Sequence, residues 1–493
     1  MDPQERIAEL EAENARLRAV VADLHAIAAE MTELKAANER LRARVEKLEA
    51  ERNRHSGNSS KPPSSDTVTQ RATQKARRAS WGKQKKGRHP GKQPGSEGRH
   101  LAQVADPDLV VRHVPERCPA CQARLGDAPV VGTETRQVFD LPDPTLVVVE
   151  HRAERRRCVC GTTSSGTFPP EATAPACWGP RVRAAATYLM VRQHLPVART
   201  AELLGEVLGA PVSTGWLASL PGEAAQGLGG FIADLKARLI SAPLLHVDET
   251  GGRTSGVREW IHVASTPLLT LLDCHARRGV EATDAIGVLP AFGGVAMHDR
   301  WAPYWANGCT HSVCGAHLLR DLAGVAEIAS QTSWAEAMAR LLLDAKDLAE
   351  QARVAGVRAV AEPTREQIRR RFDEIVADGL AANPAPLRWS GRTALERRSY
   401  NLAVALGEHK DEALRYLDDT ALPFDNNQAE RDLRMVKLQQ KVSGCFRTHV
   451  GARHFCAVRS YISTAQKHGV QALDVLVQLF AGQPWEIPSA QPA

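Results

Sequence analysis

Two carboxylates follow short apolar runs, where metal-dependent chemistry would need them. Asp248 comes directly after Leu244–Val247, and Asp299 comes directly after Val295–His298. Both runs have the length and composition of buried strands, so each strand is expected to end on a carboxylate. Hard divalent cations prefer oxygen ligands, and two ions about 3.5–4 Å apart can support in-line displacement at phosphorus. The pair therefore predicts a magnesium site.

A third candidate acid, Glu430, lies in residues 425–431, which resemble the start of a helix. Helical spacing places Arg434, Lys437 and Lys441 on the same face as Glu430. A metal-binding acid backed by three cations suits a phosphodiester, so these three cations are predicted to bind DNA. Spacing alone does not exclude four rival acids, which are Asp273, Asp284, Asp425 and Asp432.

Four of the ten cysteines form two close pairs, Cys118 with Cys121 and Cys158 with Cys160. Four thiolates in two pairs suit a tetrahedral zinc ion, and such closed sites are structural rather than catalytic. The C-x-C spacing of the second pair is short, so His151 or Cys177 could replace one ligand. Alternating valines between the pairs, from Val130 to Val149, predict strands of a small ribbon.

The first 50 residues predict a coiled coil. Apolar residues recur at spacings of three and four from Ile7 to Met31 and, after a change of phase, from Leu34 to Leu48. Asn14 and Asn38 fall on this seam, where a buried amide fixes the register of a coiled coil. We therefore expect self-association through residues 1–50.

A linker rich in Pro, Gly and Ser follows over residues 51–112. It holds a run of cations without an acid between Arg71 and Lys92. Such a run cannot bury a core, and its one-sided charge favours a polyphosphate partner over a purely solvated role. The residues predicted to bind DNA here are Arg77, Arg78, Lys83, Lys85, Lys86 and Arg88.

The remaining chain divides into four segments after the zinc-binding module of residues 113–165. Residues 170–236 are helical and contain a possible helix–turn–helix around Gly209, for which an ordinary helical hairpin is the alternative. Residues 240–330 predict a three-stranded meander, a helix and a fourth strand. Residues 331–420 predict helices alone, and residues 421–485 carry Glu430 and the C-terminal helices.

Composition limits the class of protein. The 493 residues carry a formal net charge of +6, with 43% hydrophobic residues. No apolar run approaches the ~20 residues that would span a bilayer, and no signal peptide is apparent. The expectation is a cytoplasmic protein whose thiols stay reduced.

These motifs, taken in order, resemble the insertion-sequence-66 family of bacterial transposases. The resemblance covers nearly the whole chain and includes His246–Thr250, Asp425–Arg434, Ser443–Arg447 and Arg459–Ile462. It implies a DDE-type enzyme with a ribonuclease-H-like core, in which Asp248, Asp299 and Glu430 bind two magnesium ions. The helical segment 331–420 is then an insertion into that core.

The resemblance also implies zinc binding in the cysteine module and recognition of terminal inverted repeats by the N-terminal half. Cys314 and His317 match a C-x-x-H pattern of related enzymes and are secondary candidates, because a buried thiol and a helix-start histidine also explain them. Accessory proteins of the same element are possible partners. The predicted fold is a multidomain α+β/α chain: coiled coil, zinc ribbon, helical DNA-binding region, and catalytic core with an all-helical insertion.

Two other functions compete with a transposase. A zinc-bearing, coiled-coil DNA-binding regulator would explain residues 1–236 but gives no reason for the three acids. A ribonuclease-H-like resolvase or nuclease would explain the acids but not the coiled coil and the zinc module. Magnesium-dependent nicking separates the first from a transposase, and strand joining separates the second.

Overall fold

The computed structural model describes residues 3–52, 55, 66–67, 69–71, 101–141, 143, 145–169, 171–328, 331–385 and 394–489. The six predicted DNA-binding residues of the linker, Arg77 to Arg88, lie outside these residues. No helix among the described residues is long and apolar enough to cross a membrane.

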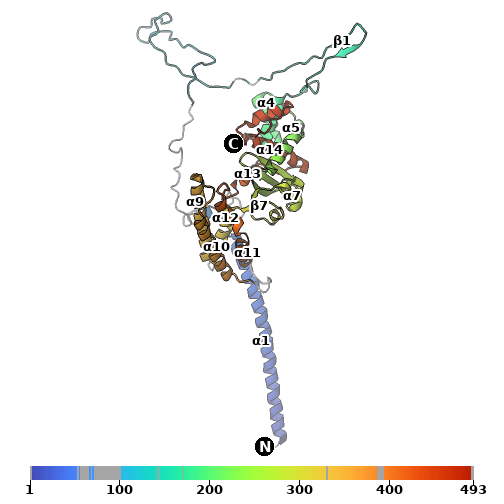
Figure 1. Ribbon diagram of the computed structural model, residues 1–493, viewed down its shortest axis with the longest axis vertical. Helices are drawn as coiled ribbons and strands as arrows, with labels where there is room; N and C mark the ends of the chain where they lie inside the picture. The colour runs from blue at the N-terminus through green and yellow to red at the C-terminus, as the bar shows by residue number, and fades with distance from the viewer. Residues whose placement is uncertain are drawn as a thin grey trace.

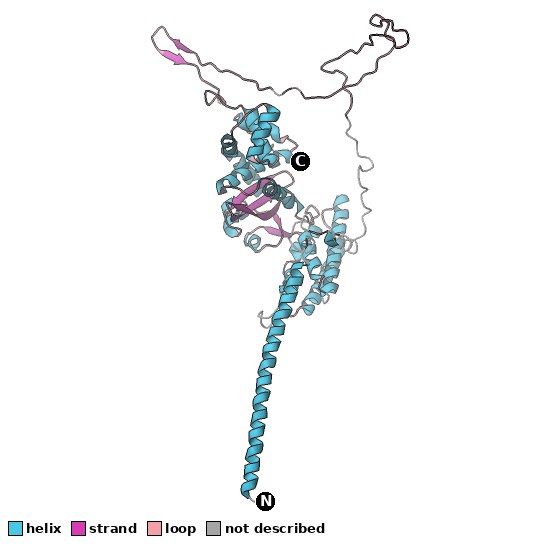
Figure 2. Ribbon diagram, turned by 180° about the vertical axis from the view of Figure 1, so that it is seen from behind, coloured by secondary structure: helices cyan, strands magenta, loops and turns pink. Residues whose placement is uncertain are grey.

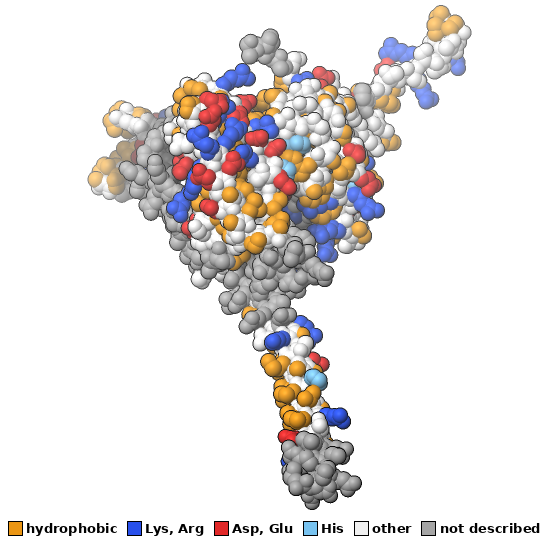
Figure 3. Space-filling model, turned by 60° about the horizontal axis from the view of Figure 1, so that its bottom comes forward, with side chains coloured by type: hydrophobic (Ala, Val, Ile, Leu, Met, Phe, Trp, Pro, Cys, Tyr) orange, Lys and Arg blue, Asp and Glu red, His pale blue; other side chains and the backbone are white. Residues whose placement is uncertain are grey.

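Residues Pro3–Arg52 form one uninterrupted helix, α1, which projects as a rod (Figure 1). Apolar side chains lie along its described surface between charged ones (Figure 3). Leu24, Leu34 and Leu41 are 58–69% exposed. An apolar stripe of this kind stabilises a long helix when it packs against a second helix. Within the described residues, no second helix packs against these leucines. The helix agrees with the prediction, while the coiled coil itself stays a prediction.

The cysteine module has less regular structure than the sequence predicted. Strands β1 (Arg155–Arg157) and β2 (Thr163–Ser165) pair in an antiparallel hairpin around the second cysteine pair. The strands expected from Val130 to Val149 are absent among the residues described there, so that prediction was wrong. Val130 and Val149 are both more than 60% exposed, because no sheet or helix among the described residues covers this stretch.

Between the cysteine module and the central sheet lie the α-helices α3 (Pro180–Thr187), α4 (Val197–Leu208), α5 (Thr214–Gln226) and α6 (Gly229–Ile240), with a π-helical turn, η2 (Tyr188–Arg192), after α3. Gly209 ends α4 in a left-handed conformation, φ 62°, which glycine adopts at no steric cost. Ser213 then starts α5 by accepting a hydrogen bond from the Trp216 amide. The predicted two-helix unit is therefore present.

The central sheet, magenta within the globular part of Figure 2, has the strand order β5-β4-β3-β6-β7. Strands β3 (Leu244–Thr254), β4 (Val257–Ser265) and β5 (Thr270–His275) form the predicted antiparallel meander. Strands β6 (Val295–His298) and β7 (Thr310–Val313) continue the sheet in parallel with β3. Thus the first and fourth strands of the sheet are neighbours.

Strand β3 is longer than the sequence predicted. It was expected to end at Val247, yet it runs on to Thr254 and pairs with β4 over its entire second half. It pairs with β6 only from Leu244 to His246. Asp248 therefore lies in the middle of a strand, at the level where its parallel neighbour ends.

Helices cover the sheet and its edges. On one face lie α13 (Asn427–Ser443) and α14 (His449–Lys467), and on the other lies α7 (Val280–Ile286). The hydroxyl groups of Ser460 and Thr464 on α14 accept hydrogen bonds from the backbone of edge strand β5. These bonds satisfy an edge that would otherwise be open to another strand.

The sheet and its surrounding helices share one hydrophobic core. It contains side chains of α3–α6, of the sheet, and of α13, α14 and α15 (Ala472–Phe480). The helical segment before the sheet is therefore continuous with the sheet's own core. The 3-10 turns η3 (Leu289–Ala291) and η4 (Ala302–Ala306) close the side that α7 covers.

A second core belongs to the helices between β7 and α13. These are α8 (Gly315–Val325), α9 (Thr332–Val354), α10 (Glu362–Ala382), α11 (Ala394–Glu408) and α12 (Lys410–Asp418). Trp334, Phe372 and Tyr416 are among its buried residues. The structure thus agrees with the prediction that residues 331–420 are helical where they are described.

The two ends of this helical segment are hydrogen-bonded to each other. The Gly315 amide donates to the Phe424 carbonyl at 2.8 Å, and the Asn426 amide donates to Cys314 Sγ at 3.1 Å. A Cβ atom at Gly315 would lie 2.2 Å from the Phe424 ring, so only glycine permits this approach. The segment leaves and re-enters the central sheet at one point.

Candidate active site

The pairing register brings Asp248 and Asp299 to the same level of the sheet. His246 on β3 is paired with Met297 on the parallel strand β6, and each aspartate lies two residues further along its chain. Two residues is one full period of a strand, so both side chains leave the sheet on the same face. Asp248 Oδ1 accepts a hydrogen bond from the Glu249 amide at 2.9 Å, and Asp299 Oδ1 accepts one from the Trp301 amide at 3.0 Å.

The turn after Asp299 has an unusual backbone. Arg300 adopts φ 74°, in the left-handed region that non-glycine residues rarely occupy. Its amide donates to His298 Nδ1 at 3.1 Å, and its guanidinium bonds to Asp321 on α8. These contacts hold the turn that directs Asp299 toward Asp248. Strained residues of this kind cluster at functional sites, where the surrounding structure supports them.

Helix α13 brings Glu430 to the two aspartates. Burial raises the pKa of Asp248 well above its ordinary value, and the negative charges of Glu249, Asp299 and Glu430 raise it further. Glu430 Oε1 also lies 3.8 Å from His317 Nε2, at the start of α8. The three predicted acids are therefore electrostatic neighbours. A site that concentrates negative charge in this way is stabilised by a bound cation.

The rival acids differ in their surroundings. Asp432 bonds to Lys467 Nζ at 2.8 Å and to the Thr270 hydroxyl, so its charge is already balanced within the fold. Asp273 lies on β5, 3.6 Å from Arg453, and Asp284 lies on α7. Asp425 Oδ1 accepts a bond from the Asn427 amide, as residues at helix starts commonly do.

Asn426 connects the strand of Asp248 to the helix of Glu430. It is fully buried, and its Nδ2 donates to the Val247 carbonyl at 2.8 Å. Its Oδ1 lies 2.9 Å from His246 Nδ1, which must therefore carry the proton and donate. Burial lowers the pKa of His246, in keeping with a neutral ring. Sequence reasoning treated Asn426 only as part of a helix start, since nothing local signals a contact 180 residues away.

Replacing Asn426 by Ala is expected to reduce cleavage about 10- to 100-fold, the usual cost of removing a group that orients a metal ligand. The change removes the hydrogen-bond partner of His246 Nδ1 and a donor to the Val247 carbonyl, so the melting temperature should also fall. The exposed neighbour variant Asn427→Ala is the matched control. Cleavage at the wild-type rate by Asn426→Ala, measured on one DNA end with Mg²⁺, would show that this contact does not position Glu430.

Glu249 organises the opposite side of the same strand. Its carboxylate is buried and accepts bonds from Arg278 Nε at 2.9 Å and from the Tyr304 hydroxyl. Burial raises the pKa of Glu249, while these two donors lower it in part. Glu249 thus has partners that Asp248 lacks, which distinguishes a structural acid from its neighbour in sequence.

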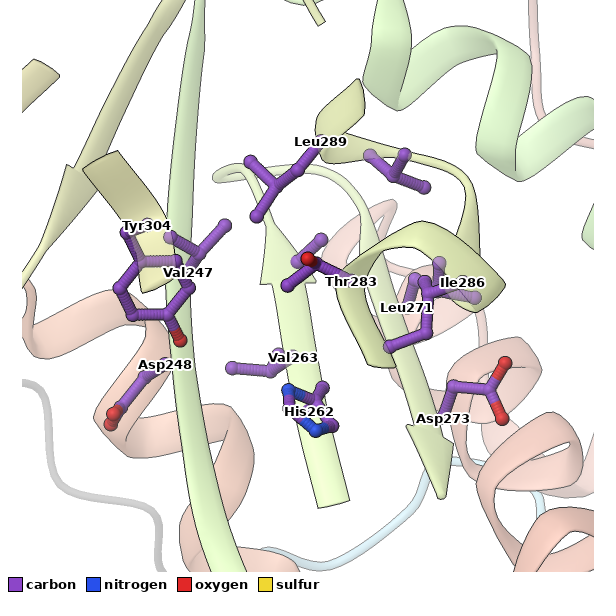
Figure 4. A pocket seen from close by; sticks show the side chains of 12 residues that line it. Val247, Asp248, His262, Val263, Leu271, Asp273, Thr283, Ile286, Leu289 and Tyr304 are labelled. Atoms are coloured by element: carbon purple, nitrogen blue, oxygen red, sulfur yellow. The ribbon is translucent and has the colours of Figure 1, made fainter. Parts of the chain in front are cut away.

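A pocket lies under α7, on the face of the sheet away from α13 (Figure 4). Its walls are mainly apolar side chains, including Leu271, Ile286 and Leu289. In Figure 4 the Asp248 carboxylate is at the rim and points away from these residues. The pocket therefore belongs to the packing of α7 and not to the acidic site.

Cys314 and His317 occupy different environments. Cys314 is completely buried, and burial raises the pKa of its thiol to about 12, so it remains protonated. His317 is beside Glu430, and its Nδ1 is buried without a hydrogen-bond partner among the described residues. The thiol thus supports the fold, whereas the imidazole borders the acidic site.

The predicted cations of α13 lie on its outer surface. Arg434, Lys437 and Lys441 are all exposed. Lys437 Nζ donates to the Gly251 carbonyl on β3 at 2.8 Å. Helix α13 therefore presents positive charge along the same strand that carries Asp248.

Each cysteine pair of the zinc-binding module lies in a tight turn. The Gln122 amide donates to the Cys118 carbonyl, and the Gly161 amide donates to the Cys158 carbonyl, both at 2.9 Å. Hydrogen bonds from Cys121 and its neighbours lower the pKa of Cys118, and bonds from Thr162 and Cys158 lower that of Cys160 to about 7. Lowered pKa values favour the thiolate form that binds metal.

The structure does not bring the two cysteine pairs together into one cluster among its described residues. His151 and Cys177, the alternative ligands, do not join a cluster there either. The donor set, with two thiol pairs in matching turns, nevertheless fits zinc by its chemistry.

A different group of potential ligands lies between β4, β5 and α14. Ligand atoms of Glu259, Cys274 and His449 lie within 4.8 Å of one another. In the structure these atoms bond to each other, with His449 Nδ1 2.9 Å and Cys274 Sγ 3.4 Å from the Glu259 carboxylate. Burial also raises the pKa of the Cys274 thiol, which keeps it a hydrogen-bond donor. Sequence reasoning did not identify this group, because its members lie on three separate elements.

Comparison with known protein families identifies the class of protein. Residues 175–454 match the family model described as "Transposase IS66 family", and residues 115–161 match the "zinc-finger binding domain of transposase IS66". Residues 1–102 match a family of unknown function. No curated protein gives a significant match. The chain is thus a DNA transposase with a zinc-binding domain.

The transposase family model, matched by residues 175–454, covers more than half of the chain. The protein therefore belongs to the IS66 family of transposases. The family assignment confirms the resemblance drawn from the sequence motifs and supports a structural zinc in the cysteine module.

Proposed function

We propose that this transposase cleaves DNA at the ends of its element and joins them to target DNA at a site made by Asp248, Asp299 and Glu430. The observation that carries the proposal is the convergence of these acids, with the pKa of Asp248 raised by burial and by the other two charges. The strand order supports a ribonuclease-H-like core, in which the first and fourth strands are neighbours.

In a DDE-type reaction, different residues of the chain would bind the metal ions, position their ligands and bind the DNA. Two magnesium ions, when bound, supply activation of the attacking oxygen and stabilisation of the leaving oxygen. The three carboxylates hold the ions, and Asn426 keeps Glu430 in register with Asp248. Arg434, Lys437 and Lys441 attract the phosphodiester backbone and fix its position along α13.

The N-terminal half is proposed to recognise the terminal inverted repeats. The zinc-binding module, the α4–α5 helix–turn–helix and the basic linker are three elements that suit duplex DNA. The protein would act in the bacterial cytoplasm, on the nucleoid, alone or with accessory proteins of the same element. A regulator without catalysis, and a resolvase or nuclease, remain the alternatives.

Incubation of the purified protein with its own element ends, a target duplex and Mg²⁺ tests the function. A transposase gives nicks at the element ends and joined products. Nicks without joined products favour a resolvase or nuclease, and binding without nicks favours a regulator.

Self-association is proposed to run through α1, whose apolar stripe has no partner within the described chain. Deleting residues 3–52 is expected to abolish complexes that hold two DNA ends, because bridging needs two linked binding units. Single-end binding should change by less than about threefold, since no DNA contact is assigned to the rod. Light scattering and gel shifts with one or two ends measure the two effects. Paired-end complexes formed by the truncated protein would contradict the role given to α1.

A further inference from the structure

Beside the acidic site, arginine and tryptophan side chains alternate in a stack. Arg258 lies 4.7 Å over the Trp260 ring, and Arg278 lies 4.7 Å over the same ring and 4.1 Å over Trp301. We call these four residues the arginine–tryptophan column. They come from β4, from the loop between β5 and α7, and from the turn that carries Asp299.

The column is linked directly to the acidic site. The Trp301 amide donates to Asp299 Oδ1 at 3.0 Å. Arg278 bonds to Glu249, the residue after Asp248. The column itself lies on the Glu249 face of the sheet, and the Asp248 side chain lies on the other face. The two faces meet at the edge of β3 that β6 leaves unpaired beyond His246. A strand of DNA whose scissile phosphate is at Asp248 and Asp299 would bring its neighbouring phosphates to the column across this edge.

The outer end of the column carries positive charges without acidic partners. The strand register places Arg253 directly opposite Arg258, and like charges in that position destabilise a hairpin. Lys437 is also close, because its Nζ donates to the carbonyl of Gly251, the residue against which Arg258 lies. Among the described residues, no salt bridge joins Arg253 or Arg258 to a carboxylate. Three cations gathered in this way favour an external polyanion.

Stacking also prepares the guanidinium groups for such a partner. Trp260 covers the flat face of the Arg258 guanidinium, while the N–H donors at its edge remain available. Arg278 is held in the stack by its bonds to Glu249. Gly251 lies beneath Arg258 and Trp260, so the column is in contact with the backbone of β3. Fixed side chains lose less entropy when they bind.

We infer that the arginine–tryptophan column, with Arg253 and Lys437, binds the backbone phosphates of the DNA strand next to the cleavage point. The inference rests on the proposed cleavage site and adds a surface on β3 and β4 to the cations of α13. A phosphate partner explains both the unpaired cations and the donors that the rings leave free. An unpaired base is a different ligand, which the experiment distinguishes.

The test measures binding of a duplex element end in Mg²⁺-free buffer at several salt concentrations. Arg258→Ala is expected to weaken binding five- to tenfold near 0.1 M salt and to reduce the salt slope by about 0.9. The double variant Arg253→Ala/Arg258→Ala should lose about twice that slope. Its melting temperature should not fall, because a repulsive pair has been removed.

Arg277→Ala is the matched control, because Arg277 lies in the same loop but is 74% exposed and faces Glu281. Binding by Arg258→Ala equal to this control would overturn the inference. So would a loss of affinity confined to DNA with unpaired ends and without a change of salt slope, which indicates base stacking. A cleavage assay with Mg²⁺ distinguishes failure of the two proposals. Absence of cleavage by the wild-type protein refutes the proposed catalytic site. Cleavage by Arg258→Ala with unchanged DNA affinity refutes only the proposed role of the column.

Discussion

Glu430→Gln is expected to lower DNA cleavage by at least about a thousandfold while leaving the affinity for an element end within about twofold of wild type. The amide keeps the shape of the side chain but removes the charge that would hold a metal ion beside Asp248. Asp248→Asn and Asp299→Asn should have effects of the same size. Nicking assays with Mg²⁺ measure the rate, and gel shifts without Mg²⁺ measure binding.

Asp425→Asn is the matched control for this experiment, because Asp425 lies one turn before Glu430 and was the nearest rival in sequence. It is expected to keep activity within about tenfold of wild type. Loss of cleavage in Asp425→Asn together with normal cleavage in Glu430→Gln would move the third metal ligand to Asp425. The pairing of Asp432 with Lys467 predicts that Asp432→Asn acts on stability instead.

Removal of zinc is expected to have the second large effect. Cys118→Ser, or treatment with a chelator, should remove one zinc ion per chain and unfold residues 113–165, because so small a module folds only with its metal. Binding of the element end should fall at least about tenfold, while the helical signal of the catalytic core persists. Metal analysis, circular dichroism and gel shifts report the three consequences separately.

The exposed Cys445 provides the control, since Cys445→Ser should keep the zinc. Retention of zinc by Cys160→Ser would transfer the fourth ligand to His151 or Cys177, and variants of those residues identify which. A wild-type chain without zinc, or normal end binding by Cys118→Ser, would contradict the structural role of the metal.

The sheet and the acids were predictable because their signals are local. Apolar runs of four to six residues define the strands, and an acid after two of them is visible without a structure. The second half of β3 was not predictable in this way. Its residues Thr250–Thr254 are polar and rich in glycine, typical of a turn, and they become a strand only because β4 pairs with them.

Contacts between distant segments account for the other differences. Asn426 and Glu249 acquire their roles from partners on other elements, which no spacing rule reveals. The valines between the cysteine pairs show the opposite error, because an alternating pattern predicts a strand only where another strand or a core is available to pair with it. The three candidate acids could be proposed from the sequence, but the residues that position them required the fold.

The closed base of the helical segment has a consequence for protein engineering. Because Gly315 and Asn426 already hold the two ends of residues 315–424 together, the position of Glu430 depends on that junction and little on what lies beyond it. Lengthening a loop whose ends are fixed costs only about 0.6 kcal/mol for each doubling. The connection between α9 and α10 is thus a suitable place to graft a foreign domain, which would give a tagged or retargeted enzyme with its catalytic geometry preserved.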